Sequence, residues 1–114
     1  MPEKQLKFLA MLVAIAASDN NIESSIDDRF GRCSFFCFYN LETKQTDFIE
    51  NSLKNDSGGV GPKVAEFLAN NGINKICATE FGPKAKDMLD KLKIETQIIK
   101  NGQTVRKIIE LLNH

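Results

Sequence analysis

The stretch Met11-Leu-Val-Ala-Ile-Ala-Ala17 decides the fold, because it is an uninterrupted apolar run with β-branched residues that ends at the polar segment Ser18-Asp-Asn-Asn21. A run of this kind is typical of a strand that is buried on both faces. We therefore expect residues 11–17 to form the central strand of a sheet and residues 18–32 to follow it as a loop.

Two further strands are expected after that loop. Residues 33–39 and 45–50 are joined by Asn40-Leu-Glu-Thr-Lys44, a length suited to a hairpin, so the two strands should be antiparallel. Residues 55–61 then read Asn-Asp-Ser-Gly-Gly-Val-Gly, which is too rich in glycine to be anything but a loop.

From Gly61 onward the chain alternates between helical and strand patterns. Helices are expected after Gly61, after Gly82 and after the natural cap Thr104, with strands at 75–79 and 95–99 between them. Such alternation implies parallel strands joined by right-handed crossovers. The predicted fold class is α/β: a mixed five-stranded sheet with three helices, in which the first three strands are antiparallel and the last two run parallel to the first.

The expected topology sends several loops to one end of the sheet. Gly-Pro-Lys occurs at 61–63 and again at 82–84, and each copy is expected to open a helix in the same manner. Efficient capping of the two helices is enough to explain the prolines when they are considered alone. Yet three helix N-termini should then point into one region, where free amides and helix dipoles favour a small anion.

Composition limits the partners. The 114 residues fit a single domain, and 42% hydrophobic and 26% charged residues are ordinary for a globular protein. Fifteen basic residues balance fifteen acidic ones, so no net field draws the chain to nucleic acid or to an acidic membrane surface. No stretch approaches the roughly 20 apolar residues of a membrane span.

The N-terminus allows two interpretations. Lys4 and Lys7 precede an apolar run that ends in small residues, as in a short secretion signal. The simpler interpretation makes residues 1–10 an extension ahead of a domain at 11–114, because removal of the central strand would leave the other elements without a partner.

The cysteines favour a reducing compartment. Cys33, Cys37 and Cys77 are an odd number, and their spacing matches neither a zinc ribbon nor a disulfide framework. A cytoplasmic location is therefore expected.

The segment Ile26-Asp-Asp-Arg-Phe-Gly-Arg32, with Tyr39-Asn-Leu-Glu-Thr43, the glycine loop and Phe81-Gly-Pro-Lys-Ala85, resembles the dinitrogenase iron-molybdenum cofactor biosynthesis family over about 11–112. The resemblance implies a ribonuclease H-like fold. It also implies a non-catalytic carrier of metal-sulfur clusters or their precursors, with cluster donor and acceptor proteins as partners.

The candidate binding residues lie in the converging loops. Arg29 and Arg32 could complement the charge of an anionic cluster, although Arg32 could instead pair with Asp27 or Asp28 and merely stiffen the loop. Phe30 is expected to be a core anchor. The glycines would let the backbone approach a ligand. The complete set comprises Arg29, Gly31, Arg32, Cys33, Gly58, Gly59, Gly61, Gly82 and Lys84.

Cys33 is the one candidate metal ligand. Family members often have a histidine in the turn where this chain has Arg29, and the only histidine here is the terminal His114. Cys33 follows the turn directly, whereas Cys37 should lie about 13 Å deeper along the strand. An iron-sulfur or molybdenum-containing sulfide cluster is the expected cofactor, while the alternative makes Cys33 a small core residue.

Two enzyme classes fit poorly and one other class stays open. Radical cluster-assembling enzymes need Cys-x-x-x-Cys-x-x-Cys, and Asn40 stands at the third position. A nuclease needs carboxylates on the central strands, where 11–17 has none, and Glu50 and Glu80 lack a clear third partner. The open alternative is a regulatory or protein-interaction module that uses the same loop edge and binds no cluster.

Overall fold

The structure is a computed structural model that describes residues 11–113. The predicted extension 1–10, the interpretation of that region as a secretion signal, and His114 lie outside the described residues. The helices and strands are, in chain order, β1 (Leu12–Ala17), β2 (Phe35–Asn40), β3 (Thr46–Glu50), α2 (Val60–Asn70), β4 (Lys75–Ala78), α3 (Pro83–Lys91), β5 (Glu95–Ile98) and α4 (Val105–Leu112).

The five strands form one sheet in the order β3-β2-β1-β4-β5, with β1 at its centre as predicted. β1 pairs with β2 and β2 with β3 in antiparallel fashion, whereas β1 with β4 and β4 with β5 are parallel. Ile15 in β1 lies opposite Cys37 on one side and Cys77 on the other. The α/β class, the mixed five-stranded sheet and the three helices are thus confirmed.

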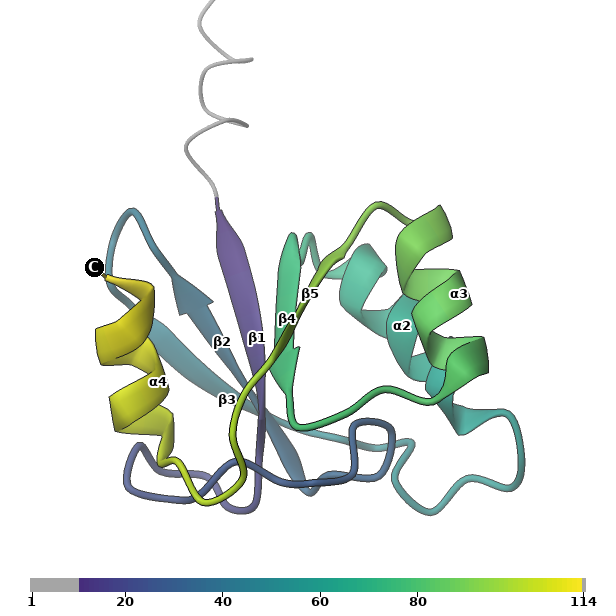
Figure 1. Cartoon of the computed structure of the whole chain (residues 1–114), viewed down its shortest axis with the longest axis horizontal. Coiled ribbons are helices and arrows are strands. Elements are labelled where there is room, and N and C mark those ends of the chain that lie inside the picture. Colours follow the sequence, from purple (N-terminus) through teal and green to yellow (C-terminus); the bar gives the residue numbers. More distant parts are fainter. Residues whose placement is uncertain (1–10, 114) are drawn as a thin grey trace, which may run out of the picture.

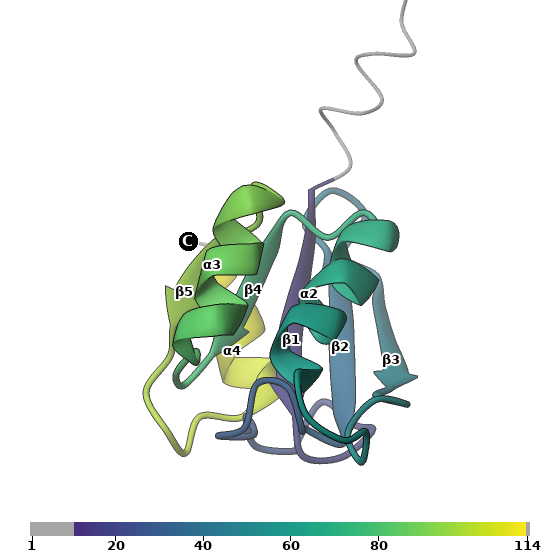
Figure 2. The ribbon, with the colours of Figure 1, turned by 90° about the vertical axis from the view of Figure 1, so that its right-hand side faces the viewer.

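Helices cover the two faces of the sheet unequally (Figures 1 and 2). α2 and α3 pack on one face, over a core that includes Ala14, Ala16, Phe36, Leu68 and Leu89. α4 packs on the opposite face, over the alternate residues of β1. Successive side chains of a strand point to opposite faces, and this is why one continuous apolar run in β1 supplies both cores.

Two predicted boundaries were wrong. β2 begins at Phe35 rather than at Cys33, because the side-chain amide of Asn51 donates to the carbonyl oxygen of Cys33 at 2.9 Å and holds it in the preceding turn. α2 begins at Val60, so Pro62 is its third residue, whereas Pro83 is the first residue of α3. The two Gly-Pro-Lys copies therefore do not open their helices in the same manner.

The described helices are too short or too polar to cross a membrane.

Candidate functional site

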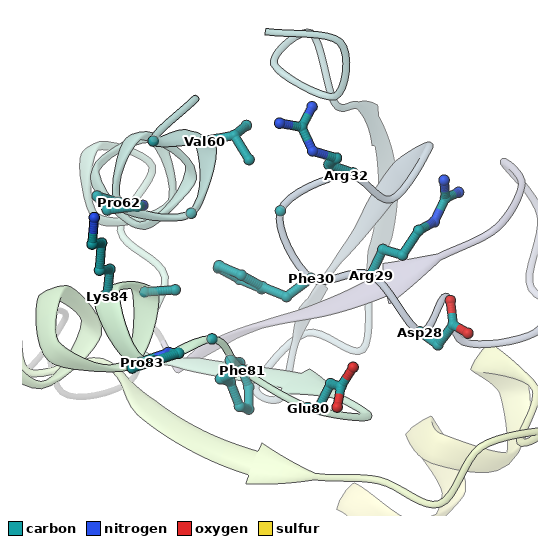
Figure 3. Close-up of a pocket in the computed structure, with 15 residues that line it drawn as sticks. Asp28, Arg29, Phe30, Arg32, Val60, Pro62, Glu80, Phe81, Pro83 and Lys84 are labelled. Carbon is teal, nitrogen blue, oxygen red and sulfur yellow. The ribbon is translucent and has the colours of Figure 1, made fainter. Parts of the chain in front are cut away.

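A pocket of about 740 Å³ opens at the end of the sheet where α2 and α3 begin (Figure 3). Three segments line it: the turn at residues 28–32 that precedes β2, the start of α2, and the connection from β4 into α3. The lining residues are Asp28, Arg29, Phe30, Gly31, Arg32, Gly59, Val60, Gly61, Pro62, Glu80, Phe81, Gly82, Pro83, Lys84 and Ala85.

Phe30 fixes the turn in this position. Its ring is only 5% exposed, and its centroid lies 6.3 Å from that of Phe36 in β2 and 5.4 Å from that of Phe81 before α3. Aromatic pairs at this separation and tilt are favourable beyond the area they bury. The prediction that Phe30 is a core anchor is confirmed, and the same residue also lines the pocket.

Glycines allow the three segments to approach one another closely. A Cβ atom on Gly61 would lie 2.9 Å from the Cβ of Ala85, and a Cβ on Gly31 would lie 3.1 Å from Cγ1 of Val60. A side chain at Gly61 would push α2 away from α3, and one at Gly31 would crowd the side chain of Val60. The close packing of the pocket wall therefore depends on Gly31 and Gly61.

The helices α2 and α3 point unoccupied backbone donors toward the pocket. Neither helix has a side-chain N-cap. Within residues 11–113 the amides of Val60, Gly61, Lys84 and Ala85 meet no hydrogen-bond acceptor. Each helix start also carries roughly half a positive charge from the peptide dipoles. The arrangement favours a negatively charged group.

The helix α4 contributes no free amides to the pocket. The expectation that three helix N-termini converge there was therefore wrong. α4 lies on the opposite face of the sheet, and Thr104 caps it by accepting from the amide of Lys107 at 3.1 Å. The amides of Val105 and Arg106 donate to the carbonyl oxygens of Ser24 and Ile22, each at 2.9 Å. The loop after β1 thus occupies the start of α4.

Both predicted arginines line the pocket, and both also have structural partners. Arg29 donates from Nε and Nη2 to the buried carboxylate of Asp27 at 3.1 and 3.2 Å, and these hydrogen bonds raise the pKa of Arg29. Nη1 of Arg32 donates to the carbonyl oxygens of Lys54 and Asp56 at 2.8 and 3.0 Å. The alternative in which Arg32 pairs with Asp27 or Asp28 names the wrong partner, since Arg29 binds Asp27 and Arg32 instead holds the loop that follows β3.

Each guanidinium keeps donors for a ligand. A guanidinium has five N–H donors, and the contacts above use two of them on each arginine. Lys84 reaches the pocket from the first turn of α3, where its side chain is exposed (Figure 3). Lys63, its counterpart in the other Gly-Pro-Lys copy, instead pairs with Asp56 at 2.9 Å and does not line the pocket.

Two carboxylates in the lining were not predicted as site residues. Asp28 and Glu80 stand across the pocket from Lys84 (Figure 3). Glu80 comes two residues after β4, at the carboxyl end of a parallel strand, where ligands of open α/β sheets usually bind. That signal could have found it. The lining has three cationic and two anionic side chains, so its excess positive charge is small.

The structure does not support Cys33 as a ligand. Cys33 is fully buried, belongs to the core beneath α2 and α3, and does not line the pocket. Burial, with a smaller contribution from the charge of Asp27, raises the pKa of its thiol to about 12. The thiolate that binds a metal is therefore disfavoured at neutral pH. Cys37 and Cys77 are also buried, and burial raises the pKa of their thiols to about 12 and about 11.

Only part of the predicted glycine loop, residues 55–61, lines the pocket. Gly59 and Gly61 line the pocket but Gly58 does not.

Among the residues that the structure describes, no three His, Cys, Asp or Glu side chains are placed to hold a metal ion together.

The sequence matches the family described as dinitrogenase iron-molybdenum cofactor over residues 11–114. The chain belongs to this family. A relative in Methanocaldococcus jannaschii, an uncharacterised protein, is 34% identical over 95 residues, which are 81% of this chain and 77% of the relative.

Two solved structures resemble this member of the family closely. The apo form of the orange protein from Desulfovibrio gigas superposes with a TM-score of 0.85 at 26% identity, over 90% of this chain and 87% of the other. A putative NifB protein from Thermotoga superposes with a TM-score of 0.77 at 27% identity, over 90% of this chain and 86% of the other.

Proposed function

We propose that this protein is a non-catalytic carrier that holds an anionic metal-sulfur cluster, or a precursor of one, in the pocket between the turn at Arg29 and the starts of α2 and α3. The main support for the proposal is that three separate segments of the chain meet around one cavity. Residues 29–32, 59–62 and 82–85 surround a single cavity with three cationic side chains and uncapped helix starts.

The chemistry of the lining fits an anion that brings its own sulfide ligands. No thiol or imidazole is among the lining residues, and the two carboxylates of Asp28 and Glu80 are too few to hold a bare iron or molybdenum ion by themselves. Arginine and backbone N–H groups do form strong, charge-assisted hydrogen bonds to anionic acceptors. The cargo would thus be held through its outer sulfur or oxygen atoms.

The relatives support this class of cargo. The family description names the iron-molybdenum cofactor, and the orange protein was solved in an apo form, the term for a protein without its ligand. The carrier role, the donor and acceptor proteins that it requires, and a cytoplasmic location are parts of our proposal. Three buried free cysteines are consistent with a reducing compartment. The ribonuclease H-like relationship stays a prediction, on which the proposal does not depend.

The test is reconstitution without oxygen. Purified protein is incubated with iron, sulfide and molybdate, desalted, and examined by metal analysis and visible absorption. We expect metal and colour to co-elute with the protein. The double variant Arg29→Gln with Lys84→Gln should retain much less, whereas Arg106→Gln with Lys107→Gln removes the same charge from the far face and should retain the wild-type amount.

Failure of the wild-type protein to retain metal or colour would end the carrier proposal. The regulatory or protein-interaction module would then take its place, because the same loop edge would remain as a surface without a cluster. Equal retention by both double variants would show that the metal is bound elsewhere.

A further inference from the structure

Four glycines line the pocket, and the fold explains three of them. Gly61 has no room for a side chain, and a Cβ on Gly31 would crowd the side chain of Val60. Gly59 has a φ of 60°, a left-handed conformation that glycine adopts without strain. Gly82 has neither constraint, since its φ is not positive and a Cβ there would meet no atom within 4 Å.

The backbone of Gly82 does not require glycine either. It is the N-cap of α3, with φ −67° and ψ 157°, the extended conformation that an N-cap of any residue type adopts. Serine, threonine, aspartate and asparagine are preferred at such a position because their side chains accept from the free amides of the first turn. Thr104 does this for α4, which faces away from the pocket.

We infer that Gly82 is a cargo-contact position, whose missing side chain leaves space for the cluster to reach the backbone at the start of α3. The inference rests on the proposed function and adds a specificity determinant to it. Gly31, Gly59 and Gly61 shape the wall of the pocket, whereas Gly82 keeps its interior open. A side chain at position 82 would enter that open space, and a capping side chain would also cover the amides of Lys84 and Ala85.

Three variants separate this role from a structural one. Gly82→Ala adds one methyl group, Gly82→Ser adds a group that can cap the helix, and Gly61→Ala is the comparison in which the methyl meets Ala85. The probe is tetrathiomolybdate, a mononuclear molybdenum-sulfide dianion, titrated without oxygen and followed by absorbance and equilibrium dialysis. Thermal unfolding of each protein is measured alongside.

We expect Gly82→Ala to melt within about 4 °C of wild type, since loss of unfolded-chain entropy offsets the poorer cap. Gly82→Ser should melt at or above the wild-type temperature, because serine caps the helix. Both variants should bind the probe at least about tenfold more weakly, with unchanged salt dependence because no charge is altered. Gly61→Ala should lower the melting temperature clearly.

Wild-type affinity in both Gly82 variants would overturn the inference and leave the carrier proposal standing. A loss of melting temperature in Gly82→Ala as large as that in Gly61→Ala would overturn it as well, because Gly82 would then be a structural glycine. Absence of binding by the wild-type protein would overturn the proposed function, and this inference with it.

Discussion

The side-chain amide of Asn51 donates to the carbonyl oxygen of Gly31 at 3.0 Å, and so ties the pocket turn to the residue that follows β3. The same nitrogen donates to the carbonyl oxygen of Cys33 at 2.9 Å, while Oδ1 accepts from the amide of Leu53 at 3.1 Å. Asn51 is 2% exposed, so its side chain is shielded from water. One buried amide therefore organises the wall on which Arg29 and Arg32 stand.

Asn51→Ala should destabilise the protein strongly. The substitution leaves backbone groups of Gly31, Cys33 and Leu53 without their partner, and an unsatisfied buried polar group costs about 1–3 kcal/mol. We expect a loss of roughly 3 kcal/mol in the free energy of unfolding, measured by urea titration with circular dichroism. Asn55→Ala, an exposed position in the same loop, should change little. Equal stability of the two variants would contradict the role of Asn51.

Arg32→Ala should loosen the loop that follows β3 without unfolding the domain. Its guanidinium donates to the carbonyl oxygens of Lys54 and Asp56. Loss of these two hydrogen bonds frees a solvent-exposed segment. We expect faster hydrogen exchange in peptides covering residues 52–58. Arg106→Ala, which breaks the pair with Glu23 on the far face, is the matched control. Unchanged exchange in 52–58 would mean that the loop is held by other contacts.

Lys84→Gln should weaken binding of tetrathiomolybdate by about three- to tenfold at low salt, because one partly screened charge leaves the lining. The difference from wild type should shrink as salt rises. Lys91→Gln lies at the far end of the same helix and should bind as wild type does. A loss of equal size in both variants would point to general charge rather than to the pocket.

The three thiols should be unreactive in the folded protein. Burial raises the pKa of each to about 11 or 12, so little thiolate exists at pH 8, and a thiol reagent such as DTNB should react only after unfolding. The folded pKa lies above the unfolded value of 9.0, so the unfolded chain loses these protons first. Stability is thus retained below pH 9 and should fall as the pH rises from 9 toward 12. Rapid reaction at pH 8 would refute the burial.

The strands and helix faces were predictable because their signals are local. The apolar run in β1 and the alternation after Gly61 define the sheet without knowledge of any contact. The same reasoning brought Gly31, Gly59 and Gly82 to one end, where the pocket lies.

The wrong predictions concern the face of the sheet on which an element lies and the residues that a side chain contacts. Neither is encoded in a local sequence pattern. The sequence places the start of α4 at the correct end of the sheet, but it does not reveal that Ser24 and Ile22 cover its amides on the other face. The partners of Arg32 are backbone carbonyls, which every residue carries, so no pattern identifies them. Cys33 turns inward because Asn51 holds its carbonyl group, a contact between residues 18 positions apart.

The most direct measurement is a proton–nitrogen correlation NMR spectrum of ¹⁵N-labelled protein, titrated with tetrathiomolybdate without oxygen. The chain has seven glycines, of which Gly31, Gly59, Gly61 and Gly82 line the pocket. Their amide signals should shift or broaden with a common affinity, while those of Gly72 and Gly102 stay in place. Shifts at Gly72 and Gly102 of the same size, or no shift at the four pocket glycines, would contradict an anion site at this end of the sheet.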